Sequence, residues 1–255
     1  MSAKRVAARL IGLGVAGLVV ASCAGSISAG SPAASSGSPA ASLPGVGTPG
    51  LGSPAASSLP AARSLAAVAS APAGWSEVSW SDPSLAVDLP ADWTAGDPTV
   101  TGDPSMVATL TGDQLKAQQW YDQMVASGAV RFLANGPMPT SQGTLSGGSI
   151  DVTVETGDAS LRAFADREAG VDAQIGALTT GITSSSMTLA IGPAIRDAYC
   201  GQLGDSPPYC EIDELVRLTD GRSLTIAISG SEASVSIAAV APFADQVLAT
   251  LRSAP

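Results

Sequence analysis

Residues 212–228 read IDELVRLTDGRSLTIAI, and this stretch decides the class of fold. Runs rich in Ile, Leu and Val lie on both sides of Asp220-Gly221, a dipeptide typical of a tight hairpin turn. In the second run the apolar residues alternate with Thr225 and Ala227, which gives a strand one buried face. The stretch therefore predicts two neighbouring antiparallel strands joined by a hairpin.

The same alternation of apolar and polar residues recurs along the chain. It is clearest at 85–89, 150–155 and 187–191, and further strands are predicted at 107–110, 129–133, 195–200 and 235–239. Alternation of this kind is typical of antiparallel sheets, whose two faces differ in polarity.

Three helices are predicted among these strands. The first begins at Thr111 and ends before Gly128, the second spans Leu161 to Leu178, and the third opens at Pro242. Their apolar residues recur every three or four positions, which gives each helix one face to bury against a sheet. We therefore predict an α+β fold, with a mainly antiparallel β-sheet and helices packed on its faces.

The segment SDPSLAVDLPADW, residues 81–93, resembles the opening of PsbP-like domains. In those domains a strand ends in Leu-Pro-x-x-Trp, which matches Leu89-Pro90-Ala91-Asp92-Trp93 here. The long middle helix, the strands after it and the closing helix are also similar to that family, which includes bacterial lipoproteins of the LpqN type. The resemblance implies an α/β/α sandwich that binds other proteins or acts as an accessory subunit, and not an enzyme.

The N-terminal segment carries a glycine motif that has another explanation. Gly12, Gly14 and Gly17 spell G-x-G-x-x-G, but no strand precedes them and no acidic residue follows before Asp82. A dinucleotide site needs both. Basic residues, a short apolar centre and then small residues are instead the layout of a secretory signal, which we assign to residues 1–22. The apolar centre is too short for a membrane span of about 20 residues.

The end of this signal resembles the lipobox of bacterial lipoproteins. Val20-Ala21-Ser22 leads directly to Cys23, and the resemblance implies cleavage before Cys23 and attachment of fatty acyl chains such as palmitate to its sulfur. The alternative is an ordinary signal peptide with a chance cysteine. We expect a protein anchored by lipid to the extracytoplasmic face of the cell membrane.

Residues 24–72 consist almost wholly of Ala, Gly, Ser, Pro, Leu and Val, with Arg63 as the single charge. Such a segment buries too little apolar surface to fold. We therefore predict that residues 23–72 comprise the lipidated cysteine and a disordered tether. All Trp, Tyr and Phe residues follow from Trp75 onward, so residues 73–255 are predicted to form a single globular domain.

The charge balance and the absence of histidine exclude several functions. The chain has 12 basic and 22 acidic residues and no histidine. Without the three basic residues of the signal the formal net charge is −13, which argues against nucleic-acid binding. Without histidine, Ser-His-Asp and Cys-His catalysis and histidine-ligated zinc are excluded. We predict no enzymatic activity, no cofactor and no metal site.

Two cysteines remain once Cys23 is assigned to lipid. Cys200 and Cys210 flank the loop GQLGDSPPY, which can turn back on itself. An exported protein lives in an oxidising compartment, so we predict a disulfide between them, which would stabilise the fold by about 2–3 kcal/mol. The alternative is a soft-metal or redox pair.

Several polar residues have both a structural and a functional interpretation. Glu168 lies in line with the apolar stripe of the second helix, so it either pairs with Arg167 or Arg217 or acts as a buried acid in proton transfer. Glu211, Asp213 and Glu214 could hold Ca²⁺, but we predict a solvated strand face because their spacing matches no calcium loop.

Tryptophans near the predicted tether could form an exposed aromatic surface for a sugar or a protein partner. We predict that Trp93 is part of the core and that Trp75 and Trp80 are exposed.

Two functions from different classes fit these observations. In the first, the domain is a non-enzymatic binding or accessory module for a protein partner in the cell envelope. In the second, it carries a lipid or small hydrophobic ligand in an internal cavity, which requires a continuous pocket lined by aliphatic side chains.

Overall fold

The computed structural model describes residues 62–67, 71–100, 107, 110, 112–140, 143–175, 177–204, 206–231 and 235–254. The predicted signal peptide, Cys23 and most of the predicted tether lie outside the described residues.

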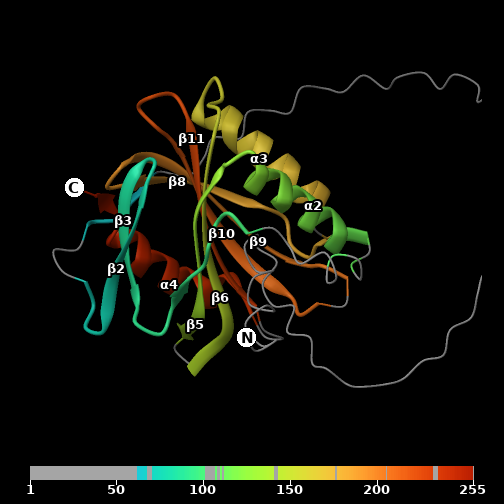
Figure 1. The fold of residues 1–255 in the computed structure, drawn as a ribbon, viewed down its shortest axis with the longest axis horizontal. Coiled ribbons are helices and arrows are strands. Elements are labelled where there is room, and N and C mark those ends of the chain that lie inside the picture. Colours follow the sequence, from blue (N-terminus) through green and yellow to red (C-terminus); the bar gives the residue numbers. More distant parts are fainter. Residues whose placement is uncertain are drawn as a thin grey trace, which may run out of the picture. The chain divides into compact units, whose positions relative to one another are not determined.

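A nine-stranded sheet forms the centre of the domain (Figure 1). Its order is β1-β8-β9-β10-β11-β6-β5-β4, and β7 also pairs with β9. The strands are β1 (Arg63–Ser64), β4 (Thr94–Ala95), β5 (Val130–Thr140), β6 (Gly143–Glu155), β7 (Ala177–Leu178), β8 (Thr183–Leu189), β9 (Gly192–Gln202), β10 (Tyr209–Arg217) and β11 (Ser223–Ser231). Within the described residues only the β1–β8 pairing is parallel. The predicted α+β class, with its mainly antiparallel sheet, is confirmed.

A second, smaller sheet joins the two ends of the domain. Its order is β12-β3-β2, from β2 (Trp75–Ser81), β3 (Ser84–Pro90) and β12 (Arg252–Ser253). Arg252 binds the carboxylate of Asp88 at 2.9 Å, which adds an ion pair to the backbone pairing of the last strand. The hairpin that begins the domain is thus fixed to the strand that ends it.

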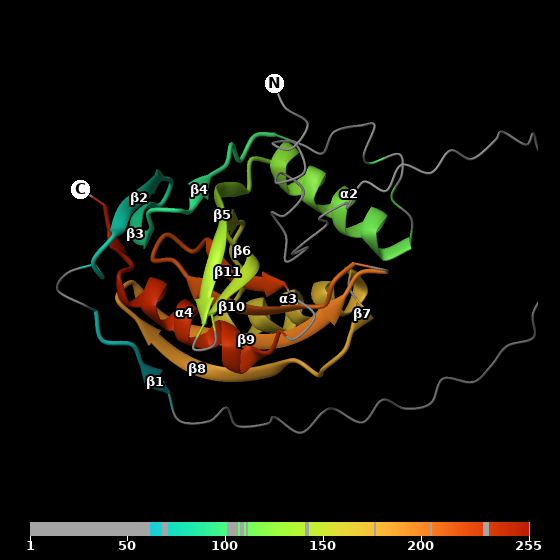
Figure 2. The same cartoon turned by 90° about the horizontal axis from the view of Figure 1, so that it is seen from below.

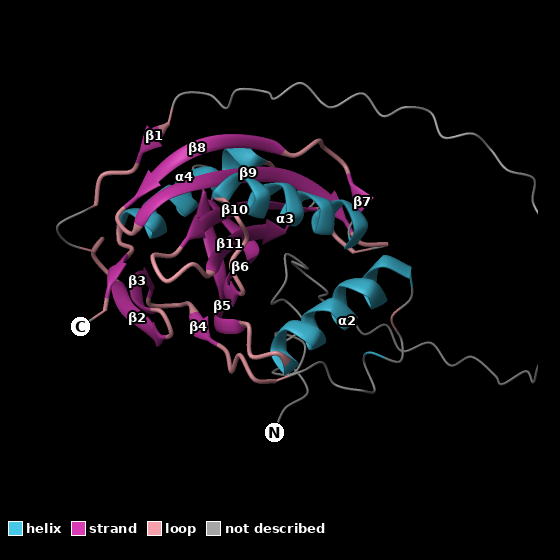
Figure 3. Ribbon diagram, turned by 90° about the horizontal axis from the view of Figure 1, so that it is seen from above, coloured by secondary structure: helices cyan, strands magenta, loops and turns pink. Residues whose placement is uncertain are grey.

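Three helices cover the large sheet: α2 (Gly112–Ala126), α3 (Leu161–Ile175) and α4 (Ile237–Ala249). The helix α4 packs on one face of the sheet, and α3 and α2 lie on the other (Figure 2). Phe164 of α3 packs directly on Ile195 of β9 and Leu215 of β10. Figure 3 shows α2 farther from the strands than α3, and Ala117 of α2 packs with Tyr199 of β9. No helix among these described residues is long and apolar enough to cross a membrane.

The helix boundaries differ from the predicted ones in two places. The second helix ends at Ile175, because Ala177–Leu178 form β7 and pair with β9. The third begins at Ile237 and contains Pro242, so the predicted start at Pro242 and the predicted strand at 235–239 are both wrong. Proline lacks an N–H group and forfeits one helical hydrogen bond, which the packing of the apolar stripe on the sheet offsets. Gly128, at φ +71°, follows the first helix as predicted.

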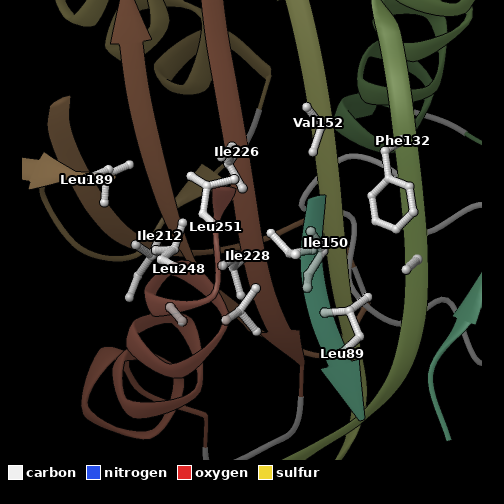
Figure 4. Close-up of a cluster of buried hydrophobic side chains, with 14 of the residues drawn as sticks. Leu89, Phe132, Ile150, Val152, Leu189, Ile212, Ile226, Ile228, Leu248 and Leu251 are labelled. Carbon is white, nitrogen blue, oxygen red and sulfur yellow. The ribbon is translucent and has the colours of Figure 1, made fainter. Parts of the chain in front are cut away.

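The apolar core lies between the large sheet and α4 (Figure 4). Ile212 of β10 and Ile228 of β11 point toward Leu248 of α4, and all three are at most 1% exposed. Leu251, directly after α4, fills the space beside them. The alternation that predicted the strands of residues 212–228 therefore directs one face of each strand into this core.

The tryptophans occupy the core more fully than predicted. Trp80 is 7% exposed and stacks on Phe132 with ring centroids 5.3 Å apart, so the prediction of an exposed Trp80 is wrong. Trp75 is partly buried, and its ring lies near that of Phe243, with centroids 5.9 Å apart. Trp93 is buried as predicted, and its indole N–H donates to the carbonyl of Pro137 at 3.0 Å.

A short part of the predicted tether lies on the domain itself. Arg63 and Ser64 form β1 and pair with β8, and the backbone N–H of Leu65 donates to the carbonyl of Thr188. Arg63 also binds the carboxylate of Asp245 in α4 at 2.7 Å. These contacts cover the outer edge of the sheet along β8, an edge that would otherwise offer unpaired backbone groups.

The disulfide between Cys200 and Cys210 is present in the structure. The two residues lie opposite each other on β9 and β10, with Cα atoms 4.0 Å apart. The backbone of Cys200 is hydrogen-bonded to Thr179 and Thr180 on its other side. The disulfide therefore fixes the end of the β9–β10 pair next to the polar residues of these strands.

Candidate functional site

The face of the large sheet beneath α2 and α3 is lined with carboxylates. Glu211 and Asp213 of β10 alternate with Cys210 and Ile212, which belong to the core under α4. Because successive side chains of a strand point to opposite faces, Glu211 and Asp213 point toward α2 and α3. The prediction that they form a solvated strand face is wrong: they are 6% and 5% exposed.

The register of the strands places three aspartates in one row across the sheet. Asp213 of β10 lies opposite Asp197 of β9 and opposite Ala227 of β11. Ala227 in turn lies opposite Asp151 of β6. The small side chain of Ala227 separates Asp213 from Asp151, which are two strand spacings apart, or about 10 Å.

The helix α3 adds two further carboxylates, Glu168 and Asp172. We name the acidic face by its six members: Asp151, Glu168, Asp172, Asp197, Glu211 and Asp213. Glu168 pairs with Arg167 at 2.7 Å, which is one of the two pairings predicted from the sequence. The hydroxyl of Tyr199 donates to Glu211 at 2.9 Å and so links β9 with β10 on this face.

Several oxygens of the acidic face have no partner. Asp151 is 3% exposed, and neither of its carboxylate oxygens has a hydrogen-bond partner among the described residues. One oxygen of Glu211 and one of Asp213 accept no N–H or hydroxyl hydrogen bond among the described residues, but the two carboxyls are hydrogen-bonded to each other. A buried polar atom without a partner costs about 1–3 kcal/mol, and more when it is charged. This face is therefore not arranged for stability alone.

Burial raises the pKa of these carboxyls, and their neighbours raise it further. Burial and the charge of Glu211 hold the pKa of Asp151 well above its usual range, and burial does the same for Asp213. Burial raises the pKa of Asp172 to about 8 and that of Glu168 to about 7, although Arg167 acts against the shift at Glu168. The acidic face therefore holds protons that it can release near neutral pH.

Tyrosines line the acidic face from three elements. Tyr121 of α2 is 3% exposed, and its hydroxyl has no hydrogen-bond partner among the described residues. Burial raises the pKa of Tyr121, and the charge of Asp151 raises it further. Tyr199 and Tyr209 contact each other edge to face at 6.5 Å. The face thus combines carboxylates with aromatic rings.

A hollow of about 830 Å³ lies at the C-terminal end of α2, beside Met124 and Gly128. Its charged residues differ from those of the acidic face. Arg131, Arg167 and Arg222 line the hollow. Arg131 and Arg222 both pair with Asp82, and Arg222 also pairs with Asp220. Because carboxylates already neutralise these cations, the hollow is a weaker candidate for ligand binding than the acidic face.

The remaining sequence-predicted residues are distributed as follows. Glu214, next to Asp213, points to the opposite face and pairs with Arg196 of β9, so the three acidic residues at 211–214 do not form one site. Among the described residues no group of three or more His, Cys, Asp or Glu residues has a geometry that could hold a metal ion. Cys23 lies outside the described residues.

The sequence matches no protein-family model, and no curated protein sequence is significantly similar to it. Two solved structures are similar at low identity. A protein from Bacteroides thetaiotaomicron is 12% identical with a TM-score of 0.31, over 68% of this chain and 46% of that one, so the chain spans about half the length of that protein. Cyanobacterial PsbP (CyanoP) from Synechocystis sp. PCC 6803 is 12% identical with a TM-score of 0.41, over 74% of this chain and 97% of that one.

The second of these structures belongs to the family that residues 81–93 resemble. At these TM-scores neither likeness places the chain in a family or carries a function over to it. The function is therefore argued from the acidic face itself.

Replacing Asp151 with Asn is expected to stabilise the protein at pH 8 by about 1–2 kcal/mol. The folded-state pKa of Asp151 is raised above the unfolded value of 3.8, so its contribution to stability is complete below that pH and is lost as the pH rises through the folded-state pKa. Asparagine has nearly the same shape and no charge, so it removes this loss.

Urea unfolding at pH 5 and pH 8 measures the effect. We expect a larger gain at pH 8 than at pH 5, whereas Asp92→Asn in an exposed turn changes neither value. Destabilisation of more than 1 kcal/mol at both pH values would show that Asp151 is instead a structural hydrogen-bond acceptor.

Proposed function

We propose that this chain is a lipid-anchored, non-enzymatic binding module on the extracytoplasmic face of the cell membrane, and that it binds a protein of the cell envelope through the acidic face. The single observation that supports this function is the buried carboxylate of Asp151, both of whose oxygens lack a hydrogen-bond partner among the described residues. A partner that brings positive charge or hydrogen-bond donors would satisfy them. An unsatisfied buried polar group lowers stability, so its presence calls for a functional explanation, and binding of a partner is the one we adopt.

The two faces of the large sheet differ in chemistry, and this difference bears on the alternative function as a ligand carrier. The face under α4 is filled by apolar side chains from both sheets and the helix, including Ile226, Phe243 and Leu248. A carrier of a hydrophobic ligand needs an apolar cavity, and this is where the aliphatic side chains are. Since these side chains pack against one another in a single cluster, the carrier function is less well supported than partner binding.

The helix α2 is suited to take part in binding. Gln114 near its start donates to the carbonyl of Leu203 at 3.2 Å and to the hydroxyl of Ser206 at 2.9 Å. Farther along, Trp120 and Met124 are only partly buried. These two side chains leave apolar surface of α2 accessible to a partner.

Crosslinking in the native host tests this function. We expect one envelope protein to be crosslinked to the wild-type chain and to be reduced at least tenfold with Asp151→Asn/Asp213→Asn. The control Asp92→Asn/Asp166→Asn also removes two carboxyl groups, at exposed positions, and is expected to retain the partner. Equal recovery with both double variants, or recovery of lipid in place of protein, would contradict the proposal.

The anchor is tested with the same material. Cys23→Ala is expected to leave the chain in the soluble fraction without acyl mass, and the wild-type chain is expected in the membrane fraction. An intact, unacylated leader on the wild-type chain would contradict lipid anchoring.

A further inference from the structure

We propose that the acidic face binds primary ammonium groups, supplied by an aliphatic polyamine or by lysine side chains of a protein partner. This inference rests on the proposed function and names the chemistry that the face recognises. It starts from Asp151, whose carboxylate is buried in the same row as Asp213 and has no partner for either oxygen among the described residues.

The charges around the centre of the face are all of one sign. The charge of Glu211 raises the pKa of Asp151. The pKa of Asp213 is raised by four charges, those of Glu211, Asp172, Asp197 and Glu168. The nearby arginines are engaged at the edge: Arg167 pairs with Glu155, Asp158 and Glu168, and Arg162 pairs with the exposed Asp166. A bound cation would relieve the repulsion among the central carboxylates.

The spacing of the carboxylates favours an organic cation over a metal ion. A calcium ion needs six to eight oxygens at about 2.3–2.6 Å. Asp151 lies about 10 Å from Asp213, because β11 runs between their strands. Two carboxylate centres at this separation fit two ammonium groups on one flexible aliphatic chain, and each centre can accept several N–H hydrogen bonds.

The tyrosines supply the second requirement. The hydroxyl of Tyr121 is buried and has no hydrogen-bond partner among the described residues, and it can accept a hydrogen bond from an ammonium group. The rings of Tyr199 and Tyr209 lie next to Glu211 on the same face. Ammonium groups bind favourably to aromatic rings as well as to carboxylates, so the combination selects for an amine.

Calorimetry on the full chain tests the site with spermidine, and 1,8-octanediol serves as a neutral probe. We expect spermidine to bind at pH 7.5 and the diol not to bind. Asp151→Asn/Asp213→Asn is expected to weaken spermidine binding at least tenfold, and Tyr121→Phe about threefold. The control Asp92→Asn/Asp166→Asn has the same formal net charge as the first double variant and is expected to bind like wild type.

A second measurement does not depend on the variants. Asp151, Asp172, Glu168, Glu211 and Asp213 all have a raised pKa, so a bound cation is expected to displace protons from them. Titrations in buffers of different ionisation enthalpy are expected to show proton release on binding. Binding without proton release, or equal affinity in both double variants, would show general attraction to an acidic protein and would overturn the proposal.

The source of the ammonium group is tested separately. A soluble peptide with two lysines is compared with its doubly acetylated form. If both the lysine peptide and spermidine bind, a protein can supply the ammonium group. If only spermidine binds, the site is assigned to free polyamines. If neither amine binds while crosslinking still depends on Asp151 and Asp213, the ammonium inference fails and the proposed function stands. If amines bind and no protein is crosslinked, the ammonium site is supported and the proposed binding of an envelope protein is contradicted.

Discussion

Replacing Arg196 with Met is expected to lower the free energy of unfolding by about 3–5 kcal/mol. Arg196 of β9 is 7% exposed and lies opposite Glu214 of β10, which is fully buried. Its guanidinium pairs with Glu214 and, at 2.9 Å, with Asp245 of α4. Removing the guanidinium leaves the carboxylate of Glu214 buried without a counter-ion.

The pH dependence of this loss identifies its cause. Burial raises the pKa of Glu214 to about 7 even with Arg196 present, and without Arg196 the pKa rises further. The carboxyl is then neutral at pH 5, so the loss measured by urea unfolding is expected to be smaller at pH 5 than at pH 8.

Two further variants separate this effect from a general loss of packing. Arg196→Met/Glu214→Leu is expected to recover most of the stability, because no buried charge remains. Arg162→Met removes an exposed arginine from α3 and is expected to change the free energy of unfolding by less than about 0.5 kcal/mol. A loss at Arg196→Met that is independent of pH and not recovered in the double variant would contradict the role assigned to the ion pair.

Local patterns in the sequence predicted most of the fold. The hairpin around Asp220-Gly221 joins β10 and β11, and Gly221 has φ +87°, as this turn requires. The apolar stripe of α4 is buried although the helix starts earlier than predicted, because the spacing of Phe243, Val247 and Leu248 defines its buried face whatever residue begins the helix.

The acidic face could be predicted only in part. In β10, Tyr209 and Leu215 flank Glu211 and Asp213 on one face, while Ile212 lies on the other, a pattern of a central strand covered on both sides. That pattern indicates burial of the two carboxylates. This burial is missed when residues 211–214 are treated as one acidic cluster.

The rest of the face depends on distant parts of the chain. Asp151 joins Asp213 only through the register of β6 and β11, and Asp172 reaches the face only because α3 packs on β9 and β10. The register of non-adjacent strands is set by the assembled sheet and not by any local pattern. A single sequence therefore shows which carboxylates can be buried, but not which of them meet.

Replacing Phe243 with Ala is expected to lower the free energy of unfolding by about 3–5 kcal/mol. Phe243 of α4 is 1% exposed and stacks on Trp93 with ring centroids 5.1 Å apart. Trp93 packs against Gly136 and Gly148, and its indole N–H donates to the carbonyl of Pro137, so moving the ring into the space left by Phe243 would break these contacts. The variant therefore leaves a cavity that the core does not close.

The loss at Phe243 is also expected to loosen the small sheet. Phe243 contacts Trp75 of β2 as well as Trp93, so it connects α4 with the hairpin of β2 and β3. Hydrogen exchange of the β2 and β3 amides is expected to accelerate more than that of the β10 amides, and the tryptophan emission is expected to shift to the red. Phe243→Leu keeps most of the volume and is expected to cost less than about 1.5 kcal/mol, and Gln246→Ala, on the exposed side of α4, almost nothing. Equal acceleration in all strands would show that Phe243 stabilises the domain as a whole and does not hold the hairpin in particular.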